Sequence, residues 1–347
     1  MAFSGSKDWG NSVTRDDIIK GALKKCGVYD SADGVPDAEL SDAATALNAI
    51  VKEWTAEGLA LWVRQRVILI LNKGFQRYTL GPTGTTGTTD NFHAFVDTQL
   101  IENTINATEV AGQTTLSILD NTATTDYWKD FQGKRATKPT TGNIGIRLDS
   151  GKILWSTITG VGADTVTIAG AGIPTGEQAS AGRKVYTYVT RVTKPMRVTY
   201  AYRQDTSGNS AEVSLIGRQE FERLSSKASA GDPVSLHFYP SLTDSTTVAS
   251  NNAHLMVWPV GNSISLDKLV MICDFYLDDL DAASNNPQFP QEWANALIWN
   301  LAGELSFEYG VDPTTRSQIL QIAAVKKQVA FAGDVENASA IFVMGRQ

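Results

Sequence analysis

The pattern of apolar and polar residues divides the chain into helical ends and a strand-rich middle. Near the N-terminus, apolar residues recur every three or four positions in SVTRDDIIKGALKKCGVYD and again in VPDAELSDAATALNAIVKEWTAEG. This spacing places them on one side of a helix. Thr14 can cap the first helix and Gly27 can end it, while Pro36 and Gly58 bound the second. Two helices joined by a short loop predict an antiparallel pair.

Helical spacing returns near the C-terminus in NNPQFPQEWANALIWNLAGELSFEYGVDP, residues 285–313. On a helical wheel of about 100° per residue, one apolar stripe is formed by Trp293, Ala294, Leu297, Ile298, Leu301 and Leu305. Trp299 lies about 140° from the centre of this stripe, and Phe307 lies on its flank. A second apolar site needs a second partner, either a neighbouring copy or another part of the same chain. Asp312 and Pro313 begin a further helix that ends near Gly333.

From Leu61 the spacing becomes that of extended strands. The stretch LWVRQRVILILNKGFQRYTLG predicts a β-hairpin with its turn at NKG. After a Gly/Thr-rich loop at residues 82–91, short strands separated by Gly, Asn and Asp continue to about residue 190 and predict a small inserted β module. Later strands are predicted in KVYTYVTRVTKPMRVTYAYRQ, AHLMVWPVG and DKLVMICDFYLDDLD, with a short helix around residues 218–224.

Together these patterns predict an α+β protein. Its N- and C-terminal helices are expected to form a helical bundle, and a central antiparallel β region is expected to carry an inserted small all-β module. The expected boundaries are 12–62 for the N-terminal helices of the bundle, 63–80 and 186–283 for the central β domain, 81–185 for the inserted module, 287–333 for the C-terminal helices and 334–347 for a C-terminal docking arm.

Composition narrows the classes of function. The 347 residues are 42% hydrophobic, which is enough for a large core, and no apolar run of membrane-spanning length or secretory signal occurs. We therefore expect a soluble protein, made in the cytoplasm, with no membrane anchor. A net charge of −7 argues against a surface that grips nucleic-acid phosphates. Cys26 and Cys273 have no metal-site spacing and are expected to be buried structural thiols.

Candidate chemistry is sparse. The three histidines, His93, His237 and His254, have no partner at motif spacing and are expected to be structural or solvent-exposed. Nucleophile-elbow, zinc-protease and phosphate-loop motifs are missing from the sequence. The acidic cluster at residues 278–281 fits a solvated strand end better than a calcium loop. We therefore predict no enzyme, no cofactor and no metal. Glu304 and Glu308, four residues apart on one helix, are expected either to form an exposed face or to pair with basic residues of another chain.

Several segments occur in an order that resembles a known family. They are DDIIKGALKKCGVYDSADGVPDAELSDAATALNAIVKEWTAEGLALW, which contains Trp54 and Trp62, then TKPMRV, SLIGRQEFERLSSKASAGDP, LMVWPV and NNPQFPQEWANALIWNLAGELSFEYG. Over about residues 14–80 and 186–332, the chain resembles the head-to-tail adaptors of short-tailed bacteriophages, also called tail accessory or packaged-DNA stabilisation proteins, in their longer, β-containing form. The smallest members are almost wholly helical, so residues 81–185 depart from the family and take no role from it.

The resemblance implies a structural virion protein located in the neck or tail. Such adaptors form a homo-oligomeric ring, usually a dodecamer, below the portal protein, and offer the lower rim to a tail nozzle or tail-fibre protein. DNA passes through the lumen during ejection, and the ring retains the packaged genome. An acidic chain without phosphate-gripping motifs suits a conduit through which DNA slides, and binding of a particular DNA sequence is not expected.

The C-terminal stretch DVENASAIFVMGRQ adds a candidate interface. Its apolar residues follow a polar linker, an arrangement unfavourable for a free tail in water; they are Ala340, Ile341, Phe342, Val343 and Met344. We expect this arm to dock on another subunit or on the portal protein, or else to fold back onto its own domain. Trp299 and Phe307 complete the predicted portal or subunit interface.

Two other functions remain open from the sequence. A virion glycan- or receptor-binding module would fit the β insertion and the abundance of Thr and Asn, although it would not need the helical ends. A cell-wall hydrolase would need a pair of carboxylates in a cleft, and the sequence assigns no such pair.

Overall fold

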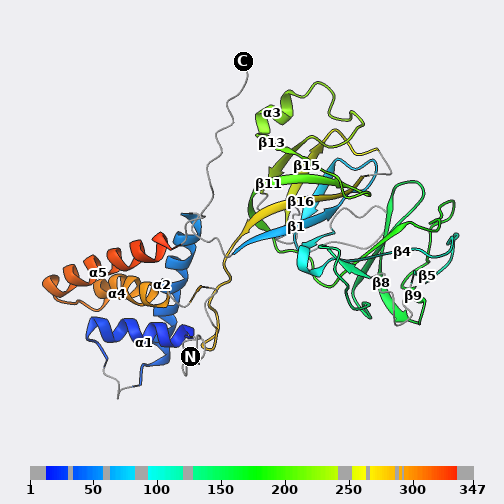
Figure 1. Cartoon of the computed structure of the whole chain (residues 1–347). Helices are drawn as coiled ribbons and strands as arrows, with labels where there is room; N and C mark the ends of the chain where they lie inside the picture. The colour runs from blue at the N-terminus through cyan, green and yellow to red at the C-terminus, as the bar shows by residue number, and fades with distance from the viewer. Residues whose placement is uncertain are drawn as a thin grey trace, which may run out of the picture. The chain divides into compact units, whose positions relative to one another are not determined.

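The computed structural model describes residues 13–29, 34–57, 63–82, 93–119, 128–240, 252–262, 266–285, 289–290 and 293–333. The chain forms two compact units (Figure 1). Unit 1 comprises Met1–Val63 and Tyr276–Gln347, and unit 2 comprises Arg64–Phe275. Unit 1 therefore joins the two ends of the chain, and unit 2 is one continuous stretch between them.

Unit 1 is helical, and two of its helices begin at a capping side chain. Its helices are α1 (Arg15–Cys26), α2 (Asp37–Ala56), α4 (Ala294–Glu308) and α5 (Pro313–Ala332). At α1, the Thr14 side chain accepts from the backbone N–H of Asp17, and the Asp17 carboxylate accepts from that of Thr14. Gly27 ends α1 in the left-handed conformation at φ 72°. The Asp312 carboxylate accepts from the first backbone N–H groups of α5.

Helix α4 lies at the centre of unit 1 because small residues let its neighbours approach closely. A Cβ placed on Gly21 of α1 would lie 3.2 Å from the Ile298 side chain. The Cys26 thiol donates to the Ala302 carbonyl at 3.3 Å, and burial raises the pKa of this thiol to about 11. On the α5 side, a Cβ on Gly303 would lie 3.2 Å from Leu320. Helix α4 is thus in close contact with both α1 and α5.

Aromatic rings fill the part of this core around Trp54, which is 2% exposed. The Trp54 ring meets those of Phe289, Trp293 and Phe331 at centroid distances of 6.1, 5.6 and 5.7 Å, mostly edge to face. The Lys327 ammonium lies 5.6 Å from the Trp54 ring and also pairs with Glu57 at 2.7 Å. The cluster therefore joins α2, the start of α4 and the end of α5.

Within the described residues, unit 2 contains three sheets. The five-stranded sheet has the order β12 (Ser210–Glu212), β11 (Pro195–Asp205), β16 (Leu266–Phe275), β1 (Arg64–Ile70) and β3 (Ala94–Val96). The four-stranded sheet has the order β13 (Ser214–Leu215), β14 (Ser235–Tyr239), β15 (Ala253–Trp258) and β2 (Arg77–Leu80). The seven-stranded sheet has the order β5 (Thr115–Ser117), β9 (Thr165–Ile168), β8 (Ile153–Val161), β7 (Asn143–Arg147), β10 (Lys184–Tyr188), β4 (Ile101–Thr104) and β6 (Lys129–Asp130). Short elements complete the unit: α3 (Arg218–Arg223) and the 3-10 helix η2 (Asp97–Gln99).

Strand β1 belongs to the middle layer of unit 2. Val67 and Leu69 pack in a cluster with Leu236 and Leu255 of the four-stranded sheet. The alternate residues Ile68 and Ile70 pack in another cluster, which includes Trp155 and Tyr186 of the seven-stranded sheet. Because successive side chains of a strand point to opposite faces, a strand covered on both sides needs a continuous apolar run. Residues 67–71, with the sequence VILIL, provide this continuous apolar run.

The expected fold class is wrong. We expected a helical bundle as the framework with the β region carried on it, whereas strands dominate, in three sheets, and the described part of the chain has five α-helices, one of them six residues long. The coarse α+β description remains compatible. Helical periodicity extends over many residues and is conspicuous in a sequence, whereas many of these strands are two to five residues long and leave little periodic signal.

The expected hairpin after Leu61 is also wrong. Strands β1 and β2 do not pair with each other: β1 pairs with β16 and β3, and β2 pairs with β15. The intervening turn hydrogen-bonds to other loops instead, since the N–H of Gly74 donates to Gly261 and that of Lys73 to Gly151. A turn signal marks where the chain changes direction but does not specify which strand becomes the neighbour.

Candidate functional site

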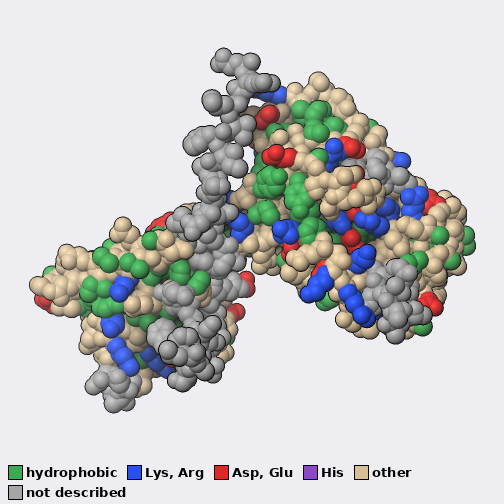
Figure 2. Space-filling view, in the orientation of Figure 1, with side chains coloured by type: hydrophobic (Ala, Val, Ile, Leu, Met, Phe, Trp, Pro, Cys, Tyr) green, Lys and Arg blue, Asp and Glu red, His purple; other side chains and the backbone are tan. Residues whose placement is uncertain are grey.

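Helix α5 carries several exposed apolar residues. Of its twenty residues, Ile319 and Ala323 are buried. Four large apolar residues remain exposed, of which Leu320, at 41%, lies toward Gly303 of α4. The other three follow one another at spacings of three and four, which places them on one side of the helix: Ile322 at 37%, Val325 at 58% and Val329 at 67%. We call these three residues the α5 stripe. Figure 2 shows apolar side chains reaching the surface over this helix. An exposed apolar stripe of this kind is typical of a docking surface.

Phe307, which the sequence placed in a subunit interface, lies near the end of α4 and is 58% exposed. The Arg316 guanidinium of α5 lies 4.6 Å from the centre of its ring, within the range of a cation–π contact. A large exposed ring of this kind adds to the apolar surface that unit 1 offers to solvent.

Trp299, the second α4 residue of the predicted interface, is half-buried. It packs against the hydrophobic core of its own unit, with the Lys25 ammonium of α1 5.0 Å from its ring. Its side chain therefore has partners within the chain, and its participation in a subunit interface stays a prediction. The predicted arm residues Ala340, Ile341, Phe342, Val343 and Met344 lie outside the described residues.

Unit 2 contains a pocket of about 270 Å³ on one face of the four-stranded sheet. The lining side chains come from β2, β14, β15 and the short helix α3, and they are Arg77, Arg218, Phe221, Glu222, His237, Tyr239, His254 and Met256. Two guanidinium groups and two imidazoles thus face one small volume. This cavity is slightly smaller than the roughly 300–1,000 Å³ that holds a drug-sized ligand.

The pairing register of the strands brings these side chains together on one face of the sheet. His237 lies opposite Met256, which lies opposite Arg77, while Tyr239 lies opposite His254. Residues two apart in a strand point to the same face, so both rows lie on one side of the sheet. The alternate positions, such as Leu236 and Leu255, belong to the core on the other side. Phe221 of α3, which is buried, stacks near His237 at 5.9 Å and forms a wall of the pocket.

Hydrogen bonds determine the orientation of the pocket's histidines. Arg77 Nη2 lies 2.6 Å from His254 Nε2, and since a guanidinium only donates, Nε2 accepts and the ring proton is on Nδ1. Nδ1 then faces Thr79 Oγ1 at 3.4 Å. Nδ1 of His237 donates to the Ile216 carbonyl at 3.1 Å, which leaves the lone pair of a neutral ring on Nε2. His254 is 4% exposed and forms the floor beneath Arg77.

The carboxylate in the pocket wall is already neutralised. Glu222 Oε2 pairs with Lys227 Nζ at 2.6 Å, and this hydrogen bond and charge lower the pKa of Glu222. The positive charge of Arg218 contributes to the same lowering of this pKa. The Arg218 guanidinium also lies 5.5 Å from the Tyr239 ring, which orients it along the rim.

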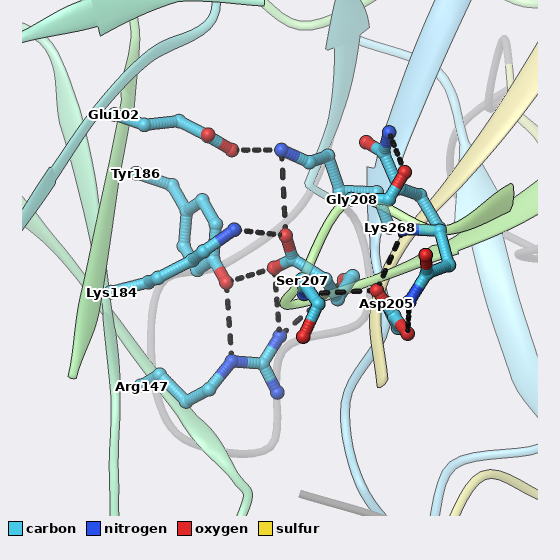
Figure 3. A network of polar contacts seen from close by, with 11 residues as sticks. Glu102, Arg147, Lys184, Tyr186, Asp205, Ser207, Gly208 and Lys268 are labelled. Carbon is cyan, nitrogen blue, oxygen red and sulfur yellow. Dashed lines mark hydrogen bonds and ion pairs between the residues drawn. The ribbon is translucent and has the colours of Figure 1, made fainter. Parts of the chain in front are cut away.

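A second polar group, buried between sheets of unit 2, is shown in Figure 3. The Asp267 carboxylate of β16 accepts from Lys184 at 2.6 Å and from the Tyr186 hydroxyl, and lies 3.5 Å from Arg147 Nη2. Lys268 pairs with both Asp267 and Glu102. Arg147, Lys184 and Tyr186 belong to β7 and β10, so the network links the seven-stranded sheet to the five-stranded sheet.

Every charge in this network has a partner, which identifies it as structural. Burial alone would raise the pKa of Asp267, but Lys268, Lys184 and Arg147 together hold that pKa below its ordinary value. Burial raises the pKa of the Tyr186 hydroxyl well above the usual range. Paired charges of this kind hold elements in one arrangement, and removing one partner is costly.

The remaining sequence candidates have structural surroundings. His93 is buried, hydrogen-bonds to Tyr188 and stacks on Trp155 at 3.8 Å. Both cysteines are free and buried, which confirms the structural interpretation. In the acidic cluster at 278–281, Asp279 pairs with Lys52 at 2.8 Å. Among the described residues, no group of three or more His, Cys, Asp or Glu side chains is placed to hold a metal ion, and no helix is long and apolar enough to cross a bilayer.

The pocket could not be predicted from the sequence because its residues are far apart along the chain and share no motif. His237 and His254 are seventeen residues apart along the chain, and Arg77 lies in a distant strand. The signal present in the sequence is the alternation of apolar and polar residues in β2 and β14. In β15 the same face carries His254 next to Met256 and Trp258, so the alternation is weaker there. The pairing register that brings these faces together is set by tertiary structure and has no local signature.

Comparisons with known proteins add no relative to this description. No family model matches the sequence, and no curated protein matches it.

Proposed function

We propose that the chain is a structural protein of a bacteriophage virion, a head-to-tail adaptor that assembles into a ring between the portal protein and the tail nozzle or fibres. The observation that carries this proposal is the α5 stripe of Ile322, Val325 and Val329, which unit 1 leaves exposed. The ordered resemblance of the helical ends and later strand segments to such adaptors supports the same conclusion.

Burial of the α5 stripe against a partner would stabilise the assembled state. Each Val or Ile side chain gains about 1.5–3 kcal/mol on full burial, so three side chains that are 37%, 58% and 67% exposed leave a few kcal/mol for a partner to supply. In a ring of identical copies, the same surface recurs on every copy and meets a different surface of the next one. Contact of α5 with a neighbouring copy therefore buries every stripe at once. Phe307 extends the apolar surface of unit 1 on α4.

The partners follow from this assignment. The ring, with twelve copies as the expected number, binds the portal protein on one side and a nozzle or fibre protein on the other. DNA passes through the lumen without sequence-specific binding, which accords with the net charge of −7. The second candidate function, a glycan- or receptor-binding module on the virion, is favoured by the pocket on the four-stranded sheet.

The test measures assembly separately from folding. We replace Ile322, Val325 and Val329 together by glutamine, which favours helix and removes the apolar stripe. Mass is measured by light scattering for the full-length chain, alone and mixed with the portal protein of the same phage. The wild-type chain should form a closed ring with the portal protein, and the triple variant should stay a monomer with an unchanged melting temperature.

A control on the same helix separates loss of the stripe from a general effect on α5. Ser317 and Ala324 are exposed on another side of α5, and both are replaced by glutamine. This control variant should assemble like the wild type. The proposal fails if the wild-type chain remains a monomer with the portal protein, or if the triple variant assembles as readily as the control.

A further inference from the structure

We propose that the C-terminal arm, residues 334–347, folds back onto the α5 stripe of its own chain and covers it until a neighbouring copy replaces the arm. The arm lies outside the described residues, and its sequence is DVENASAIFVMGRQ. The consequence for assembly rests on the proposed adaptor function, because the stripe is the surface to which that function assigns the ring contact. The docking itself concerns the free chain and is tested without the portal protein.

The stripe and the arm need the same kind of partner. Ile322, Val325 and Val329 are exposed on one side of α5. Ala332, which is also exposed, lies three residues beyond Val329 and continues that side toward the end of the helix. In the arm, residues 340–344 have the apolar sequence AIFVM. Apolar surfaces gain free energy when they leave water together, so each surface is a suitable cover for the other.

The linker between the helix and the apolar part of the arm is long enough for this contact. Residues 334–339 separate Gly333 from the apolar segment, and six residues span up to about 20 Å when extended. Along the helix, Val329 lies about 6 Å and Ile322 about 17 Å before Gly333. The chain can therefore reverse direction after α5 and bring its apolar segment alongside the stripe.

The charges beside the stripe favour the same path. Lys326 lies four residues after Ile322 and three before Val329, so its side chain borders the stripe. The charged residues of the linker are both acidic, Asp334 and Glu336. A linker that turns back toward the stripe brings these carboxylates toward the ammonium group of Lys326, and opposite charges attract.

Tethering favours the chain's own arm over the arm of another copy. A segment held by a short flexible linker has an effective concentration in the millimolar range at a site that it can reach. A second copy matches this only when copies are gathered side by side, as they are in the proposed ring. The arm therefore restrains assembly of the free chain, and neighbouring copies displace it once the portal protein brings them together.

The experiment measures how fast a thiol on α5 reacts with a bulky alkylating reagent in the free full-length chain. Val325→Cys places the thiol in the stripe, and Ala324→Cys places it one residue away on an exposed side outside the stripe. Each is combined with the natural arm or with a serine arm, in which Ile341, Phe342 and Val343 are replaced by serine. The two natural thiols are buried, and peptide mass spectrometry reads each site separately.

The arm should protect the stripe and leave the rest of the helix accessible. With the natural arm, Val325→Cys should react at least about tenfold more slowly than with the serine arm, which corresponds to about 1.4 kcal/mol. This protection should not depend on protein concentration, because the arm and the stripe belong to one chain. Ala324→Cys should react equally fast with either arm. Ile322→Cys, at the other end of the stripe, repeats the measurement without changing Val325.

Three results would overturn the docking. Equal rates with the two arms, for both Val325→Cys and Ile322→Cys, mean that the arm does not cover the stripe. Protection that increases with protein concentration assigns the cover to a second copy. Equal protection of Ala324→Cys means that the arm surrounds the helix without selecting the stripe.

The restraint on assembly is measured by light scattering on chains that keep the natural stripe, mixed with the portal protein of the same phage. The serine arm should allow rings to form at a lower concentration than the natural arm does, because no contact has to be displaced first. An equal or higher concentration would overturn the restraining role of the arm. Failure of the adaptor proposal gives a different result, since neither chain then assembles while the alkylation rates still differ.

Discussion

The cores of the two units differ in the kinds of side chain that they contain. Around Trp54, the core of unit 1 consists of aromatic rings and aliphatic side chains. Unit 2 has apolar clusters as well, but two of its sheets are joined through the buried carboxylate of Asp267 and the cations around it. Apolar packing tolerates adjustment, whereas a buried ion network permits only the arrangement that pairs every charge. The contrast predicts that the two units fail in different ways.

The largest expected effect comes from breaking the ion network. Asp267→Asn leaves Lys184, Lys268 and Arg147 without their shared counter-charge in a buried position. We expect a loss of about 5 kcal/mol in the free energy of unfolding of unit 2, at the upper end of the range for a broken buried ion pair. Calorimetry should show the transition of unit 2 moving to lower temperature while that of unit 1 stays in place.

The pH dependence of the same variant identifies the cause. The folded-state pKa of Asp267 is lowered, so its contribution is complete above the unfolded-state pKa of about 3.9 and is lost as pH falls through the folded value. Wild-type unit 2 should therefore lose stability below about pH 4 more steeply than Asp267→Asn does. The exposed Asp164→Asn change is the matched control. Equal slopes for wild type and Asp267→Asn would contradict a charge-pairing role.

A somewhat smaller loss is expected from the aromatic cluster of unit 1. Trp54→Ala removes a buried ring that contacts Phe289, Trp293 and Phe331. Truncations of this kind cost about 3–5 kcal/mol, and we expect about 3–4 here because Lys327 can settle into part of the space. The melting transition of unit 1 should fall while that of unit 2 is unchanged. A simultaneous fall of both transitions would mean that the units unfold as one.

The smallest expected effect is at the start of α1. Thr14→Ala removes the side chain that accepts from the Asp17 N–H and should destabilise unit 1 by about 1 kcal/mol. Thr14→Ser keeps the acceptor and should restore most of the loss. Chemical denaturation followed by the helical signal in circular dichroism, to which the long helices of unit 1 contribute most, measures both variants. If alanine and serine behave alike, the cap does not contribute to stability.

The sequence predicted best where structure depends on neighbours along the chain. The Thr14 cap, the Gly27 end and the α4 stripe of Leu297 and Leu301 follow from spacing alone, and the structure has all of them. It predicted poorly where structure depends on pairing between distant segments. Nothing local distinguishes Asp267 from a charged residue at an ordinary strand end, because its partners come from β7 and β10.

The candidate sites show the same division. The exposure of Phe307 follows from its place on the flank of the α4 wheel, and the structure leaves it exposed. The α5 stripe was not singled out from sequence, since Val325 and Val329 could equally have faced the core. The pocket required the register of three strands, which places Arg77, His237 and His254 on one face. Side-chain alternation was visible in β2 and β14, but the alignment between strands was not.

The apolar pattern of strand β1 does not specify its register, unlike the pattern of a strand with one polar face. Sliding β1 by one residue along β16 would exchange Val67 and Leu69 for Ile68 and Ile70, and both sets are apolar, so the usual penalty for a slip disappears. The register of β1 is specified instead at the end of the strand, where Arg64 lies opposite Asp274 and pairs with it at 2.9 Å. Asp274 also holds Arg197 of β11 at 2.6 Å. Asp274 thus fixes the register of three adjacent strands, β11, β16 and β1. The apolar residues of β1 can therefore change in shape without a shift in strand register.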